Sequence, residues 1–177
     1  MINLNLRLNN PIEMYFLKAI TMKTKTFFLL GTIFLTACVD PCVDKICLNG
    51  GSCLDGSCVC PDFYEGDDCG TEEREKYFAT YSGTTTYTDS QGNSSSYADS
   101  KVINSNNQGV TYFNIGAGIY ANLTTSKSGV FEIPSQAGAD TTSYFSGSGA
   151  FTASQIDYSI TVESSGQTLT MSFTGTK

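Results

Sequence analysis

The clearest pattern of hydrophobic and polar positions lies near the end of the chain. Apolar side chains occupy every second position from Ile156 to Val162, and again from Leu169 to Phe173. The stretch between them, Ser164 to Gln167 (SSGQ), has the composition of a tight turn. Because successive side chains of a strand point to opposite faces, this pattern predicts an antiparallel hairpin with one buried face.

Shorter alternating runs precede this hairpin, and turn-like clusters separate them. The clusters read DSQGN, NSNNQG, GAG, TSKSG and PSQAGAD. Six further strands are expected between the clusters, at residues 79–87, 95–104, 110–115, 119–125, 128–133 and 142–147. Short strands at a spacing of about 10–15 residues favour a mainly β fold. We therefore expect an antiparallel barrel or sandwich of about eight strands over residues 71–177.

The start of this β domain carries a different signal. Thr71 is followed by acidic residues at Glu72, Glu73 and Glu75. A threonine at the N-cap and acids in the first turn favour a helix, because both satisfy the positive end of its dipole. We expect a short helix that begins at Thr71 and ends before the strand signals start at Ala79.

The N-terminal part has the pattern of an export signal. From Met22 the chain reads MKTKTFFLLGTIFLTAC, with Lys23 and Lys25 ahead of a nine-residue apolar run, 27–35. This run is shorter than the roughly 20 residues that a membrane-spanning helix needs. The layout predicts a secretory signal over residues 1–37, with translation starting at Met22. A buried helix of the protein core is the alternative.

The residues that end this segment, Leu35-Thr36-Ala37-Cys38, resemble the lipobox of bacterial lipoproteins. The resemblance implies that the chain is cut before Cys38 and that the Cys38 thiol carries a lipid. A second acyl group on the new amino terminus would make the attachment stable, since a single chain holds a protein only weakly. We therefore expect an exported bacterial protein that is attached to a membrane through this lipid. The expected membrane is the outer membrane.

Six further cysteines follow within a short stretch. The chain has seven cysteines in all, and those from Cys42 to Cys69 are separated by four, five, four, one and eight residues. In an exported chain this density indicates a disulfide framework, and fifteen pairings of six cysteines are open. Paired C-x-x-C elements, which zinc sites favour, do not occur here, so no metal site is expected.

The spacing of these cysteines resembles the EGF-like module, in particular its tenascin-type repeats. The similarity is carried by Asn49-Gly50-Gly51, by CLDGSCVC and by the final CPDFYEGDDC. It implies an EGF-like module over residues 38–70 with three disulfides: Cys42–Cys53, Cys47–Cys58 and Cys60–Cys69. Phe63 stands where such modules usually have glycine, so the last turn should differ slightly. Calcium is not expected, because it needs six to eight oxygen ligands and Asp67 and Asp68 fit solvated turn positions.

Charge and composition restrict the partners and the chemistry. The net charge is −7, which excludes the basic surface that nucleic-acid binding requires. The chain has no histidine, so the commonest general base is missing. Ser146-Gly147-Ser148-Gly149 is therefore expected to be a strand end or bulge and not a nucleophile turn. We expect no catalytic residues and no cofactor.

The β domain as a whole resembles the lipocalin-like (calycin-type) domains that follow EGF-like modules in exported Bacteroidetes lipoproteins. REKYFATYSGT, FEIPSQ, FSGSGAF and the final hairpin carry this similarity. We expect a non-enzymatic protein of the cell envelope in which an EGF-like stalk presents the β domain for binding or structure. A protein, a glycan or an apolar molecule could be its partner.

Two other functions remain open at this stage. A lipocalin-like carrier would hold an apolar small molecule in a hollow barrel, whereas side chains would fill the interior otherwise. An envelope hydrolase would need two acids that meet in a cleft. The acids available for that role are Asp89, Asp99, Glu132, Asp140, Asp157 and Glu163.

Overall fold

A computed structural model of the chain describes residues 40–138 and 141–177. The expected signal over residues 1–37, its start at Met22 and the lipidation site Cys38 lie outside these ranges. Residues 44–177 belong to one compact unit. Within the described ranges no α-helix occurs, and no helix is long and apolar enough to cross a membrane.

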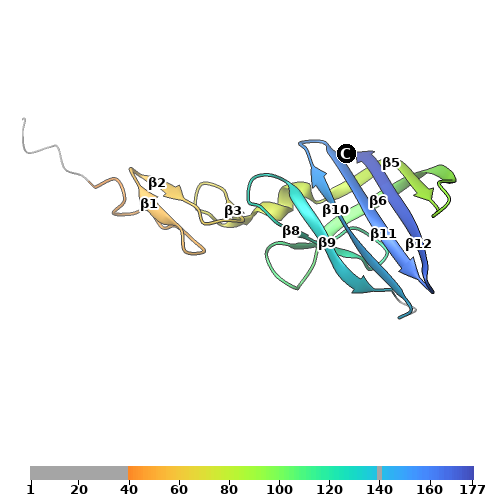
Figure 1. The fold of residues 1–177 in the computed structure, drawn as a ribbon. Helices are drawn as coiled ribbons and strands as arrows, with labels where there is room; N and C mark the ends of the chain where they lie inside the picture. The colour runs from red at the N-terminus through yellow and green to blue at the C-terminus, as the bar shows by residue number, and fades with distance from the viewer. Residues whose placement is uncertain (1–39, 139–140) are drawn as a thin grey trace, which may run out of the picture. The chain divides into compact units, whose positions relative to one another are not determined.

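The cysteine-rich module contains two small antiparallel sheets (Figure 1). Strand β1 (Ser52–Leu54) pairs with β2 (Ser57–Val59), and β3 (Tyr64–Glu65) pairs with β4 (Thr71–Glu72). Disulfides join Cys47 to Cys58 and Cys60 to Cys69. Cys42 and Cys53 are also disulfide-bonded, so the described part of the module holds three disulfides. A sheet this small depends on such cross-links, because it buries little surface of its own.

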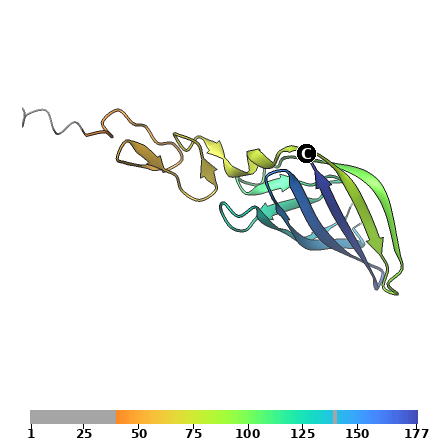
Figure 2. The same ribbon diagram turned by 90° about the horizontal axis from the view of Figure 1, so that it is seen from above.

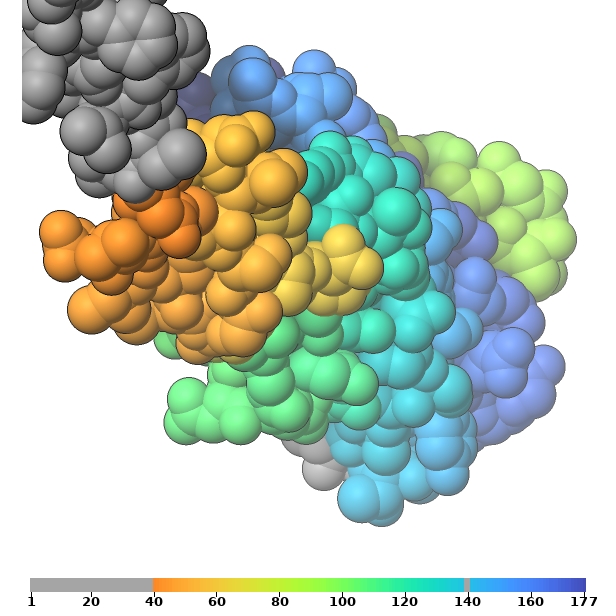
Figure 3. Space-filling view, turned by 90° about the vertical axis from the view of Figure 1, so that its left-hand side faces the viewer, coloured from red at the N-terminus to blue at the C-terminus, as the bar shows by residue number. Residues whose placement is uncertain are grey.

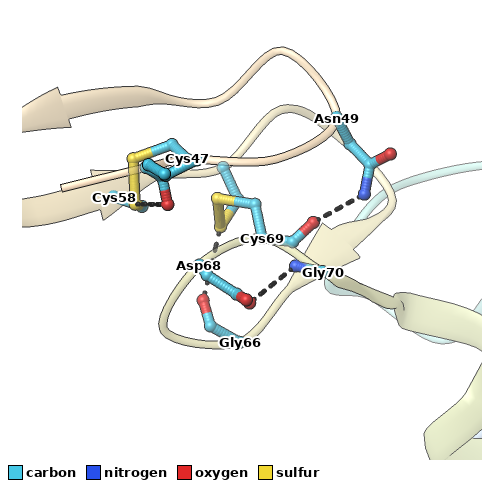
Figure 4. The surroundings of a disulfide bond; sticks show 9 residues. Cys47, Asn49, Cys58, Gly66, Asp68, Cys69 and Gly70 are labelled. Carbon is cyan, nitrogen blue, oxygen red and sulfur yellow. Dashed lines mark hydrogen bonds between the residues drawn. A yellow bond between two sulfur atoms is a disulfide. The ribbon is translucent and has the colours of Figure 1, made fainter.

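The Asn49-Gly50-Gly51 stretch fits tightly between two of these cysteines. Asn49 and Gly50 both have left-handed backbones, with φ of 51° and 83°. The Asn49 side chain donates a hydrogen bond of 2.8 Å to the carbonyl oxygen of Cys69 (Figure 4). A Cβ atom on Gly51 would lie 2.9 Å from the Cys69 sulfur. The stretch therefore forms a turn with no room for a larger side chain at its third position.

The helix at the start of the β domain differs from the expected one. Thr71 is not an N-cap, because it lies in β4 with an extended backbone paired to Glu65. The helix is the 3-10 helix η2 (Glu73–Tyr77), and Glu72 at its N-cap makes no side-chain capping bond. Pairing with β3 thus shortens the helix to five residues and carries the module's sheet past the expected boundary at residue 70.

Phe63 connects the module to this region. Its φ is 66°, a left-handed conformation that is costly for an aromatic residue, by about 1–3 kcal/mol. Its backbone N–H donates to the Ser126 hydroxyl at 3.2 Å, and its carbonyl oxygen accepts from the N–H of Glu73 at 2.8 Å. Its ring packs against the barrel core. These three contacts offset the backbone strain and hold the last turn of the module against the barrel.

Eight strands of the described residues form a closed antiparallel barrel, which confirms the expected fold class and selects the barrel over the sandwich. Figure 2 shows the long strands β5 and β6 side by side. The closed order is β10-β11-β12-β5-β6-β7-β8-β9. The strands are β5 (Ala79–Thr88), β6 (Ser94–Ser105), β7 (Tyr112–Asn114), β8 (Tyr120–Leu123), β9 (Val130–Ala137), β10 (Ser143–Phe151), β11 (Gln155–Ser164) and β12 (Gln167–Thr176).

The last hairpin follows the alternating pattern closely. Ile156, Tyr158 and Ile160 of β11 are buried, as are Met171 and Phe173 of β12. Ser164 pairs with Gln167 across a two-residue turn. Ser165 and Gly166 in that turn both have positive φ, 50° and 77°. Such a turn matches the natural twist of the two strands and fixes their register.

Of the two alternatives expected for Ser146–Gly149, a strand end or a bulge, the structure shows a bulge-like irregularity within β10. Its register against β9 shifts between Phe145 and Gly147. Gly149 is required for packing, because a Cβ there would lie 2.4 Å from the Phe131 ring and 2.5 Å from the Tyr158 Cβ. The small residues of β10 thus allow neighbouring rings to lie directly on the strand.

Aromatic rings fill the end of the barrel next to η2. Phe151 stacks on Tyr77 of η2, with 4.3 Å between ring centroids. The rings of Phe131 and Phe113 lie 5.0 and 5.4 Å from Phe151, and Tyr81 lies at 6.0 Å. We call these five residues the aromatic cluster. Each such ring pair contributes about 0.5–1.5 kcal/mol beyond the buried area.

A buried carboxylate fixes the loops at this same end. Glu73 is 1% exposed. It accepts hydrogen bonds from the Ser126 hydroxyl at 2.8 Å and the Lys127 N–H at 2.6 Å, and it forms an ion pair with Lys76 at 3.4 Å. The neighbouring Arg74 donates to the carbonyl oxygens of Asn106 and Tyr112. Figure 3 views this end, with loop 106–111 in green and loop 124–129 in teal.

Glu73→Ala should destabilise the fold by about 2–4 kcal/mol, because it removes two charge-assisted hydrogen bonds from a buried carboxylate and leaves the Lys127 N–H without this partner. Glu75→Ala in the same helix changes an exposed side chain and should cost under about 0.5 kcal/mol. Urea unfolding with intact disulfides measures both. Equal losses for the two variants would show that Glu73 does not hold the loop.

Candidate functional site

The barrel interior is filled at one end and hollow at the other. Connections between consecutive antiparallel strands alternate between the two ends of a barrel. Helix η2 precedes β5, so the β5–β6, β7–β8, β9–β10 and β11–β12 connections lie at the end away from η2. Toward that end, beyond the aromatic cluster, the interior contains a cavity of about 270 Å³. This cavity is the candidate site.

Most of the cavity wall is apolar. β11 and β12 form one side with inward side chains of the hairpin, and β10 contributes Phe145. The β7–β8 connection forms the facing wall. The apolar lining residues are Ile115, Ala117, Ile119, Phe145, Ile160, Val162, Leu169 and Met171. An apolar wall with few polar groups is typical of a small-molecule site.

The facing wall has an unusual backbone. Three consecutive residues, Gly116, Ala117 and Gly118, have positive φ of 95°, 51° and 76°. Gly116 lies next to the Lys101 side chain, because a Cβ there would be 3.9 Å from the Lys101 Cδ. β7 has three residues and β8 has four. Because both strands are short, the loop between them forms this part of the cavity wall.

A single cation, Lys101, contributes to the described cavity wall, and it is paired. Its ammonium lies 2.8 Å from Asp99 Oδ2. The same oxygen accepts from the fully buried Thr85 hydroxyl at 2.8 Å, and Asp99 Oδ1 accepts from the Ser100 N–H at 2.7 Å. The Lys101 ammonium, followed by the Thr85 hydroxyl, lowers the pKa of Asp99 below its ordinary value. The Asp99–Lys101 pair is therefore ionised and carries no net charge.

Two phenols complete the polar part of the wall. Tyr158 is 5% exposed, and burial, with smaller effects from Asp99, Tyr87 and Tyr97, raises its pKa well above the ordinary value. Tyr87 accepts a hydrogen bond of 3.3 Å from the Tyr97 hydroxyl. That bond, followed by burial, raises the pKa of Tyr87 to about 12. Both phenols are thus neutral at physiological pH and can donate a hydrogen bond.

This arrangement suits binding of a neutral or weakly polar molecule. Within the described residues no group of three or more His, Cys, Asp or Glu side chains is placed to hold a metal ion. None of the described acids considered for a hydrolase lines the cavity. Asp99 lies behind Lys101, Asp89 bonds to Asn93 in the β5–β6 turn, and Asp157 bonds to Gln155. Glu132 and Glu163 are exposed, and Asp140 lies outside the described residues.

The six predicted disulfide cysteines, which are the described ones, belong to the module, and none of them lines the cavity. Their described pairs, Cys47–Cys58 and Cys60–Cys69, are those that the EGF-like resemblance implies. Asp67 and Asp68 are exposed turn residues. The structure thus separates the cysteine framework from the candidate site.

The sequence did not reveal Lys101, Tyr87 and Tyr158 as site residues. In β6, Asp99 and Lys101 share a face with the buried Ile103, whereas Val102 points outward and is 52% exposed. Neither face of that strand is consistently apolar, so alternation alone does not identify its inward side. The sequence did contain one signal for this site: the oppositely charged Asp99 and Lys101 stand two positions apart, and Ile103 follows at the same spacing.

Comparisons with known proteins give one short similarity. A segment of 43 residues is 46% identical to the human hepatocyte growth factor activator serine protease. It represents 21% of this chain and 7% of that protein, so the chain spans only a small part of that relative. No family model matches the chain.

The raised pKa of Tyr87 predicts a pH dependence of stability. A phenol whose pKa is higher in the folded state contributes stability that is present below about pH 10 and lost toward pH 12. Tyr87→Phe should therefore reduce the decline in unfolding free energy over this interval, as measured by urea unfolding at successive pH values. Curves that run parallel for the variant and the wild type would contradict the assignment.

Proposed function

We propose that the barrel binds a small, mostly apolar molecule in the cavity at the end away from η2. The cavity itself is the observation that carries this proposal. Its volume of about 270 Å³ is slightly below the range of about 300–1,000 Å³ typical of pockets for drug-sized ligands. The ligand is therefore a compact molecule or a short chain. The hollow interior favours the carrier over a role that uses only the outer surface.

The role is binding and not catalysis. The lining offers an ammonium already paired to Asp99 and two neutral phenols. A general base would need a group that titrates near neutral pH, whereas the pKa values of Tyr87 and Tyr158 are raised away from that range. A fixed set of donors on an apolar wall is suited to holding a molecule unchanged.

The same proposal places the protein at a bacterial cell envelope, attached through a lipid on Cys38. Support comes from the signal-like residues 22–37 and from the lipobox-like Leu35 to Cys38. The module that follows would be an EGF-like stalk. The described pairs Cys47–Cys58 and Cys60–Cys69 support this, as does the short similarity to the human protease.

A cavity-filling substitution tests the binding site. Leu169→Trp should lower affinity for the small neutral fluorophore 1-aminoanthracene by about tenfold or more, because the indole occupies the cavity. Thr168→Trp adds the same side chain at the adjacent, exposed position and should leave affinity unchanged. Full-length protein with Cys38→Ser, which removes the lipidation site, serves for fluorescence titration. Equal binding by both tryptophan variants, or no binding by the parent, would exclude this site.

Attachment through Cys38 has a separate test. Cells that express the chain and are grown with labelled palmitate should yield a labelled protein, and Cys38→Ala should abolish the label. Cys42→Ala provides the matched control, since it removes a disulfide cysteine. Label that persists in Cys38→Ala would refute the lipid attachment and leave the binding proposal untouched.

A further inference from the structure

We infer that the cavity selects uncharged molecules that carry one hydrogen-bond-accepting oxygen, such as alcohols or ketones, over carboxylates and amines of the same size. The inference rests on the proposed function and specifies its ligand class. The residues that set this preference are the Asp99–Lys101 pair, Tyr87 and Tyr158.

The polar groups of the wall can act as hydrogen-bond donors. The Lys101 ammonium has three N–H bonds and directs one to Asp99. The Tyr87 oxygen accepts from Tyr97, so its own O–H is left to donate. No hydrogen bond joins the Tyr158 hydroxyl to residues 40–138 or 141–177, and Tyr158 lines the cavity. A hydroxyl donor that lines the cavity and has no protein partner favours a ligand that brings an acceptor.

The charge at the site opposes ionised ligands. Lys101 is neutralised by Asp99 at 2.8 Å, so a ligand carboxylate at Lys101 would also approach the Asp99 carboxylate. An amine that approached Asp99 would meet Lys101 in the same way. In a partly buried site of low effective dielectric, such like-charge contacts cost more than in water. A neutral oxygen gains the Lys101 and tyrosine hydrogen bonds without this cost.

Asp99 is held in place, so it cannot move aside for an anion. The Thr85 hydroxyl, which is fully buried, and the Ser100 N–H both donate to it. Lys101 lies between Gly116 and the ring of Phe173. The Lys101 ammonium is 5.9 Å from the centroid of that ring. Lys101 is therefore a fixed part of the wall with Asp99 held behind it, and the net charge of zero of this pair is a property of the site.

Three ligands of equal chain length test the inference: 1-octanol, octanoate and octylamine. Each competes with 1-aminoanthracene on the full-length Cys38→Ser protein at neutral pH and low salt. We expect 1-octanol to displace the probe at a concentration about tenfold or more below that of either charged compound. Preference for octanoate or octylamine would overturn the inference and leave the binding site intact. Failure of the probe itself to bind would refute the proposed function as well.

Changes of single charges make the test specific. Asp99→Asn releases Lys101 and should improve octanoate binding by about tenfold while changing that of 1-octanol by less than about threefold. Lys101→Met should shift the preference toward octylamine, and it provides a second route if Asp99→Asn does not fold. Glu163→Gln removes one exposed carboxylate and should leave the order unchanged. Unchanged preferences in a folded Asp99 or Lys101 variant would overturn the inference.

Discussion

The packing of Phe151 on Tyr77 is the interaction on which the rest of the structure depends. Tyr77 belongs to η2, the short helix that connects the module to the barrel. Phe151 is the last residue of β10 and is far from Tyr77 in the sequence. Their rings stack at 4.3 Å and are surrounded by Phe113, Phe131 and Tyr81. A barrel of eight strands has an interior that side chains can just fill. These large rings fill one end of the interior and belong to the buried apolar core.

Because the large core side chains gather at one end of the barrel, the interior at the other end is not filled. The fully buried side chains of the aromatic cluster, together with Ile103, Leu123, Ile133 and Ile156, stabilise the barrel near η2. Beyond them the interior also contains polar side chains, as at Thr85 and Lys101, and its volume is not filled. An unfilled volume costs free energy, because its lining loses dispersion contacts. The filled half compensates for this cost, and the cavity can persist without collapse of the strands around it.

Much of the fold follows from local sequence signals, whereas the site does not. The alternation at Ile156 to Val162 and the SSGQ turn predict β11, β12 and their register, because strand period and turn chemistry act over a few residues. Closure of the barrel depends on pairing between β12 and β5, the last and the first of its strands, which no local pattern encodes. The failed N-cap at Thr71 has the same origin, since pairing with Glu65 overrode a helical preference. Lys101, and the role of Asp99 as its partner, were missed because β6 has polar residues on both faces.

The left-handed Phe63 has a mechanical consequence. A glycine at this position could make the same two backbone hydrogen bonds, whereas Phe63 in addition packs its ring against the barrel core. Tension applied to the N-terminal side of the module would therefore pass through Phe63 into Glu73 and the loop that contains Ser126. The aromatic cluster lies between these contacts and the cavity. Pulling on the chain would strain the filled end of the barrel first and leave the geometry of the hollow end undisturbed.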